Sequence, residues 1–146
     1  MRYVTHSADH VGDPPVESKV PSAVTGREID EEGLYRLGER IFNLQRAILT
    51  REGHRGRASD VLPETDFTLP LKFDHGNPET ALPGKGNEVV FRKGQVLDRE
   101  KFEGMKDEYY QLRGWDVKTG LQKKDRLATL GLDDVARELN TKGLVV

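Results

Sequence analysis

The feature that most constrains the fold of this chain is a long amphipathic helix predicted for residues 30–51. Asp30 is a good N-cap, and the two glutamates that follow it suit the positive end of a helix dipole. Apolar residues then recur at spacings of three and four, the pattern of one buried helix face. They are Leu34, Leu37, Ile41, Leu44 and Ile48. We therefore expect this stripe to belong to the core.

Four shorter helices are predicted around it. They span about residues 17–25, 98–113, 123–130 and 133–142. A glycine follows each of them and can take the left-handed conformation that ends a helix. In the second of these helices, Phe102, Met105, Tyr109 and Leu112 share one face, which we expect to be core. Trp115, the only tryptophan, is expected to be a packing anchor.

Residues 54–97 are expected to form a long loop, because four prolines and five glycines preclude a long helix there. Residues 88–97 could form a small hairpin that turns at Lys93 and Gly94, and residues 84–88 are expected to be a plain turn. A structureless connection of this length is uncommon inside a compact domain. We therefore expect the loop to wrap across something larger.

Together these patterns predict a mainly α fold, an irregular helical array with a long wrapping loop and room for one small β-hairpin. Residues 1–16 are expected to be an irregular segment, and residues 17–146 a single helical domain.

Composition excludes several classes of function. With 23 basic and 25 acidic residues, the net charge of -2 provides no attraction to nucleic acid or to an anionic membrane. No apolar run approaches the roughly 18 residues of a membrane helix, and no secretory signal is visible, so a cytoplasmic location is expected. The absence of cysteine excludes a disulfide, a cysteine nucleophile, a thiolate zinc site and a self-contained iron–sulfur cluster.

The first candidate ligand site lies near the N-terminus. On a helix, His6 and His10 with Asp9 and Asp13 could offer metal ligands, but the turn signals of "GDPP" at 12–15 argue against a helix there. We expect no metal at this place. His10 and Asp13 stay candidates for contact with a small ligand, because loops often carry such contacts.

The second candidate site is a group of arginines at the end of the long helix. They are Arg46, Arg51, Arg55 and Arg57. Arginines can bind a carboxylate or phosphate through two parallel hydrogen bonds, and Arg51 and Arg55 are our candidates for contact with a ligand or a substrate channel. The alternative is that the arginines complement the helix dipole and pair with nearby acids. Those acids are Glu39, Glu52 and Asp60.

The stretch "DEYYQLRGWD" at 107–116 gathers acids, tyrosines and an arginine. A general acid–base pair is conceivable there. Helical spacing instead places Tyr109 on the apolar face and leaves the charges as a capping network around Gly114, so no catalytic residue is predicted.

Four stretches, taken together in this order and spacing, resemble the C-terminal region of the tungsten-dependent aldehyde ferredoxin oxidoreductase family. They are "SAVTGREIDEEGLYRLGERIFNLQRAILTREG" (22–53), "DVLPE" (60–64), "LDREKFEGMKDEYYQLRGWDVKTGL" (97–121) and "LATLGLDDVARELNTKGL" (127–144). The resemblance runs from about residue 20 to residue 145. "HVGDP" and "REGHRGR" are also similar to the branch that contains the active-site subunit of tungsten-type benzoyl-coenzyme A reductases.

This resemblance implies an oxidoreductase with an N-terminal β-rich domain and two mostly helical domains. The family holds tungsten between two pterin dithiolenes beside a [4Fe-4S] cluster. Electrons pass from an aldehyde, or in the reductase branch toward an aryl-coenzyme A thioester, through that cluster to or from ferredoxin.

The chain departs from the family in its chemical groups. The CxxCxxxC motif and the fourth cysteine of the cluster are absent, as are the pterin-binding domain and the acid–base glutamate and histidine. No ligand or catalytic residue can therefore be carried over, and we expect no tungstopterin or cluster to be bound by this chain alone. The chain is expected to be an excised domain, a truncated frame or a separate subunit that needs the rest of its parent enzyme or a partner subunit. The alternative is a stand-alone helical scaffold or interaction module.

Overall fold

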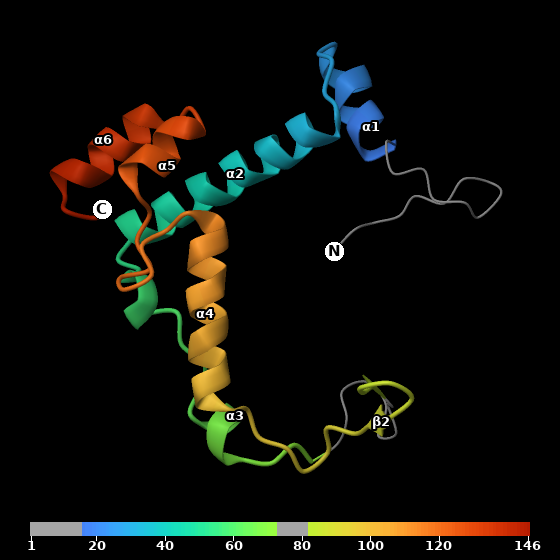
Figure 1. Cartoon of the computed structure of the whole chain (residues 1–146). Coiled ribbons are helices and arrows are strands. Elements are labelled where there is room, and N and C mark those ends of the chain that lie inside the picture. The colour runs from blue at the N-terminus through green and yellow to red at the C-terminus, as the bar shows by residue number, and fades with distance from the viewer. Residues whose placement is uncertain (1–15, 73–81) are drawn as a thin grey trace. The chain divides into compact units, whose positions relative to one another are not determined.

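The structure, a computed structural model, describes residues 16–72 and 82–146. The chain divides into two compact units, which are described separately here. Unit 1 comprises the chain up to His54 together with Leu121–Val146, and unit 2 comprises Arg55–Gly120. Figure 1 shows that helices dominate the described residues and that the strands are very short. The predicted mainly α class is confirmed.

In unit 1, two helices follow each other at the start of the described chain. Helix α1 spans Val16–Thr25, and Gly26 ends it with a φ of 67°. Helix α2 spans Glu31–Arg51, and the Asp30 carboxylate accepts a hydrogen bond of 2.7 Å from the Gly33 amide. The Ser22 hydroxyl accepts from the Ile29 amide at 3.0 Å and so fixes the turn between the two helices.

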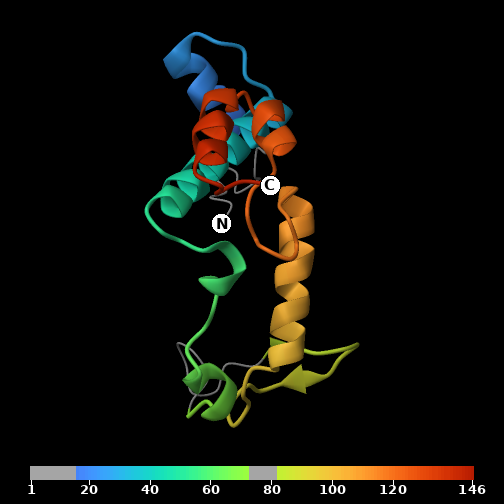
Figure 2. The ribbon, with the colours of Figure 1, turned by 90° about the vertical axis from the view of Figure 1, so that its left-hand side faces the viewer.

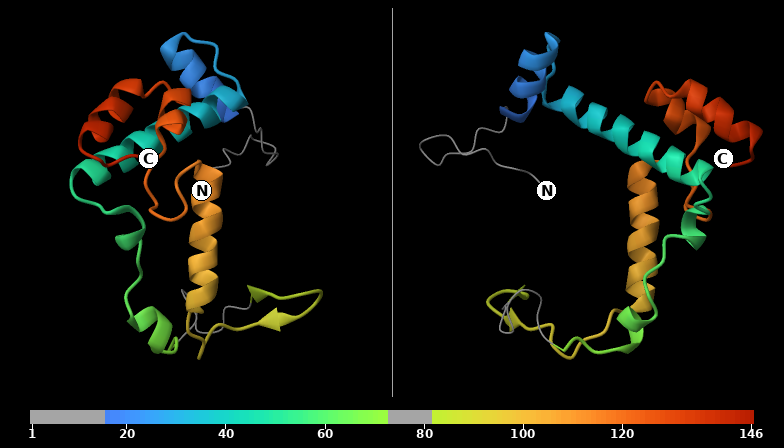
Figure 3. Two further views of the ribbon diagram at one scale, coloured as in Figure 1. Left: turned by 60° about the vertical axis from the view of Figure 1, so that its left-hand side comes forward. Right: turned by 180° about the vertical axis from the view of Figure 1, so that it is seen from behind.

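The core of unit 1 is built around the C-terminal helix pair. Helix α5 spans Lys124–Thr129 and helix α6 spans Asp133–Thr141, with Gly131 at a φ of 66° in the turn between them. Figure 2 and Figure 3 show the pair beside α2. The buried apolar cluster consists of Ala47, Leu127, Leu130, Leu132, Ala136, Leu139 and Val145. Helix α2 therefore contributes only an alanine to this cluster.

The prediction that the leucine and isoleucine stripe of α2 is core is wrong. Leu37, Ile41, Leu44 and Ile48 are exposed in the structure, and Leu34 is only half-buried. The buried residues of α2 come instead from its opposite, mostly polar face. They are Asn43, Arg46, Ala47 and Thr50. Periodicity identified an apolar face correctly, but α5 and α6 pack on the other one.

Unit 2 is organised around helix α4, which spans Arg99–Arg113 and ends at Gly114 with a φ of 69°. Before it lie the short helices η1, at Gly56–Ala58, and α3, at Thr65–Thr68. Figure 2 shows α3 beside the N-terminal end of α4, where the Phe67 and Phe102 rings lie 5.7 Å apart between centroids.

The small hairpin exists, but the predicted location is wrong. Strand β1, Leu82–Pro83, pairs antiparallel with β2, Val89–Val90, so the segment 84–88 read as a turn is the hairpin's own turn. Gly94 does lie in a turn, with a φ of 82°, and its amide donates to the Leu71 carbonyl at 2.8 Å. No strands flank this second turn, because the carbonyl of Gln95 accepts from the amide of Leu71 in the preceding loop.

The prediction for the apolar face of α4 is wrong in most of its members. Phe102 is half-buried, but the other three are exposed, namely Met105, Tyr109 and Leu112. The buried residue of this helix is Tyr110, which was not on the predicted face. Trp115 is buried and stacks on the Tyr110 ring at 6.0 Å, so the predicted packing anchor is confirmed.

Two glycines bring distant segments of unit 2 into backbone contact. The Arg57 amide donates to the Thr119 carbonyl at 2.7 Å, and Gly56 has a φ of 56°. A Cβ at Gly56 would lie 2.1 Å from that carbonyl oxygen, and one at Gly120 would lie 2.6 Å from the Arg57 nitrogen. The approach therefore requires glycine at both positions.

Candidate functional site

The densest polar cluster of unit 2 centres on Arg57, which follows directly from this backbone contact. Its guanidinium is 2.5 Å from the Asp107 carboxylate and 2.6 Å from the Glu103 carboxylate, both on α4. It also donates to the Val117 carbonyl at 3.0 Å. The hydrogen bonds to the carboxylates, that of Asp107 first and that of Glu103 second, raise the pKa of Arg57 above its ordinary value. Arg57 thus joins the 55–60 segment to α4 as a fixed cation.

The acids and the tyrosine around Arg57 are engaged as well. Lys106 lies 2.8 Å from Glu103, and this contact, helped by Arg57, lowers the pKa of the Glu103 carboxyl. The Tyr110 hydroxyl donates to the Asp60 carboxylate at 2.6 Å. The side chains of the 107–116 stretch therefore hold unit 2 together. Asp116 accepts from the Thr119 amide at 2.8 Å and from the Thr119 hydroxyl at 2.7 Å, which fits the expected capping role near Gly114.

Of the four arginines, Arg46 and Arg51 belong to unit 1 and Arg55 and Arg57 to unit 2, so the two pairs are described separately. The Arg46 guanidinium lies 3.4 Å from the His54 ring. Arg51 lies 3.3 Å from Glu52, as expected, and 3.8 Å from Glu138.

The two other acids expected to pair with the arginine group have different partners. Glu39 pairs with Arg126, and Asp60 with Tyr110. Arg55 differs from its neighbours, since its side chain is exposed and makes no ion pair within residues 16–72 and 82–146.

The other candidate residues, His10 and Asp13, lie outside the described residues. In the described part of the chain, no group of three or more histidine, aspartate and glutamate side chains is placed to hold a metal ion. None of the helices in this part combines the length and the apolar character that a membrane span needs.

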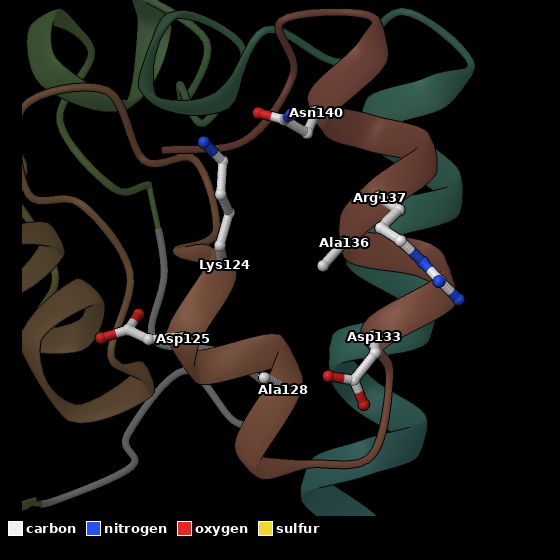
Figure 4. Close-up of a pocket in the computed structure, with 7 residues that line it drawn as sticks. All are labelled: Lys124, Asp125, Ala128, Asp133, Ala136, Arg137 and Asn140. Carbon is white, nitrogen blue, oxygen red and sulfur yellow. The ribbon is translucent and has the colours of Figure 1, made fainter.

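A shallow groove of about 510 Å³ separates α5 from α6 in unit 1 (Figure 4). Ala128 and Ala136 supply its apolar surface. Charged and polar side chains of both signs surround it, namely Lys124, Asp125, Asp133, Arg137 and Asn140. The mixture of charges favours no particular ligand.

Sequence reasoning missed the buried polar contact beneath α2. The Gln122 side-chain amide donates to the Asn43 carbonyl oxygen at 3.0 Å and to the Asn43 side-chain oxygen at 2.7 Å. Both residues are fully buried. Polar residues 43, 46 and 50 lie on one face of α2, and this spacing was the signal available in the sequence. Nothing near Gln122 indicated a partner 79 residues away.

The chain is similar to known proteins over most of its length. Residues 3–132 match the family model described as aldehyde ferredoxin oxidoreductase, domains 2 and 3. The tungsten-containing aldehyde ferredoxin oxidoreductase of Pyrococcus furiosus is 32% identical over 111 residues, which cover 76% of this chain and 15% of the relative. The protein of the same name from Pyrococcus abyssi is 30% identical over 113 residues, covering 77% of this chain and 15% of the relative.

The matched region is therefore a small share of each relative, while the family model covers most of this chain. The chain belongs to the aldehyde ferredoxin oxidoreductase family and corresponds to part of its C-terminal, helical region.

Proposed function

We propose that this chain serves as a non-catalytic helical part of a tungsten-containing aldehyde ferredoxin oxidoreductase and completes the protein shell around cofactors held elsewhere in that enzyme. The parent enzyme would oxidise an aldehyde and pass the electrons through a [4Fe-4S] cluster to ferredoxin. One observation carries the proposal. Both long helices turn their apolar faces outward, as expected of a piece that packs against more protein.

The donor groups of this chain do not fit the cofactors of such an enzyme. A [4Fe-4S] cluster is held by cysteine thiolates, and the sequence contains no cysteine. Within the described ranges, the histidines and carboxylates also fail to gather in threes. The proposal therefore assigns tungstopterin and the cluster to the rest of the enzyme and routes no chemical step through this chain.

The candidate residues Arg51 and Arg55 are the basis for a secondary role at the substrate channel. Arg55 presents an exposed guanidinium with no ion pair in the described residues, whereas Arg51 is already engaged by Glu52 and Glu138. We therefore favour Arg55 over Arg51 for contact with an anionic group of a ligand. His10 and Asp13 stay proposals of the same kind. The benzoyl-coenzyme A reductase branch and a cytoplasmic location also stay predictions.

The test is an assay of the purified chain. Elemental analysis should find no stoichiometric tungsten or iron, and an aldehyde should not drive the reduction of a viologen dye. Tungsten and iron at one equivalent or more, or aldehyde-dependent dye reduction, would contradict the non-catalytic role. An intact family enzyme carrying this chain in place of its own matched region should keep dye reduction, and complete loss with normal metal content would contradict the shell role.

A further inference from the structure

We propose that the exposed apolar seam of α2 binds a single helix from the part of the enzyme that lies outside this chain. The seam consists of Leu37, Ile41, Leu44 and Ile48. The inference rests on the proposed function and names the partner surface that this function requires.

The seam differs from scattered exposed apolar residues because its members form one continuous row. Leu37, Ile41, Leu44 and Ile48 are 42%, 50%, 38% and 43% exposed, and they follow one another along three turns of the same helix. Single exposed apolar residues are normal on a protein surface, but a contiguous row marks an interaction site. Moreover, the opposite face of α2 is already covered by the α5–α6 pair, so rotation of the helix cannot bury the seam within unit 1.

The spacing of the seam indicates that its partner is a helix. The four residues are separated by four, three and four positions, which is the repeat of a helix–helix contact. Tyr35 and Leu49 are also exposed and extend the apolar surface beside this row. Gly38 lies at the edge of this row, and a Cβ built on it would meet nothing within 4 Å. A second backbone can therefore approach closely at that turn.

The N-terminal end of the seam opens into a groove of about 370 Å³ between α2 and the end of α5. Leu37 and Leu130 line it together with Gly33 and Gly131, and Arg36 and Arg40 stand beside them. A large side chain of the partner helix fits such a space, as a knob fits a hole.

Charge decides between the candidate partners. Arg40 flanks the seam and has no ion pair in the described parts of the chain. If two copies of α2 paired in parallel through the seam, Arg40 of one copy would lie opposite Gln45 of the other. In an antiparallel pair, Arg40 would lie opposite Ala47. Self-association therefore provides no acid for Arg40. A helix with an acidic flank does provide one. Since the match covers 15% of each relative, about 85% of the relative's length lies outside it, and that helix is assigned to this remainder of the enzyme.

The test uses overlapping synthetic peptides that cover the Pyrococcus furiosus relative outside its matched region. Because the chain contains no cysteine, Ile41→Cys introduces a single thiol for a polarity-sensitive fluorophore. Peptides that combine a three-and-four apolar row with an acidic flank should shift the emission to the blue. Unlabelled Ile41→Glu should bind these peptides about tenfold or more weakly than the unaltered chain.

Val24→Glu is the matched control, because Val24 is an exposed apolar residue of α1 away from the seam. It should bind the peptides as the unaltered chain does, and circular dichroism should show both glutamate variants equally helical. Light scattering should find the unaltered chain monomeric. A dimer that Ile41→Glu dissociates would make a second copy the occupant and overturn the proposal, as would the absence of any seam-dependent peptide. Neither result depends on the metal and dye assays that test the proposed function.

Discussion

Helix α2 and the α5–α6 pair belong to the same unit and carry the same kind of amphipathic pattern, yet they use it in opposite ways. The pair turns its apolar residues inward, so that Leu127 and Leu139 are among the most deeply buried side chains. Helix α2 turns its leucines and isoleucines outward and buries Asn43 and Thr50 instead. The difference shows that an apolar stripe predicts burial in an assembly, and the assembly need not be the chain itself.

Helix α4 of unit 2 follows α2 in this respect. Its apolar face of Met105 and Leu112 is exposed, and the helix is attached to the rest of the unit by Tyr110 and by the ion pairs of Arg57. Apolar burial therefore dominates the α5–α6 region, whereas α2 buries mostly polar residues and α4 combines aromatic ring contacts with ion pairs.

The largest effect is expected at the centre of the α5–α6 core. Leu127 is 0% exposed, so Leu127→Ala should lower the free energy of unfolding by about 3 kcal/mol through lost burial and the cavity left behind. Leu112→Ala, on the exposed face of α4, should change it by about 0.5 kcal/mol or less. Urea unfolding of both variants measures the difference, and equal losses would remove the distinction between the two regions.

The next effect concerns the polar contact beneath α2. Gln122→Ala removes both hydrogen bonds to Asn43, and because the site is buried the loss should be about 1–3 kcal/mol. Gln45→Ala is the control, since Gln45 is an exposed glutamine of α2. Urea midpoints that coincide for the two variants would mean that α2 is held in unit 1 by something other than this contact.

Local features of the fold were predictable because their causes lie within a few residues. Asp30 and Gly114 each act within one turn of the chain, so sequence alone indicated where α2 begins and where α4 ends. The long-range contacts had no such signal. Gln122 and Asn43 are 79 residues apart, and Arg57 and Asp107 are 50 apart. Nothing in helical spacing selects one acid among the 25 that the chain offers.

The exposed apolar residues of α2 and α4 have a different cause. A stripe of leucines indicates that some apolar surface will cover it, but the identity of that surface is a property of the whole assembly. The same resemblance that identified the family also predicted a missing remainder, and that remainder is the natural cover.

A smaller effect is expected from acid on unit 2. The pKa of Glu103 is lowered in the folded state by Lys106 and then Arg57, so the stability it contributes is present above the unfolded pKa of about 4.3 and is lost as the pH falls through the lower folded value. Because the Glu103 side chain is 43% exposed, solvent screening keeps this contribution modest.

Hydrogen exchange at pH 6 and at pH 3.5 measures this loss separately in α4 and in α6. Amide protection in α4 should fall more than protection in α6, and Glu103→Gln should reduce the difference. An equal fall in both helices would show that α4 does not depend on its ion pairs.

The smallest effect is expected at the middle of the α2 seam. Ile41→Ala removes a half-exposed side chain and introduces the residue with the best helix propensity, so the two contributions offset and the free energy of unfolding of the chain alone should change by about 0.5 kcal/mol or less. The same substitution at buried Leu139 of α6, Leu139→Ala, should cost about 2 kcal/mol or more. Urea unfolding of the two variants therefore compares an exposed apolar residue of α2 directly with a buried one of α6. A loss at Ile41 as large as that at Leu139 would mean that the seam is already covered within this chain, whereas no loss means that its burial awaits the partner helix.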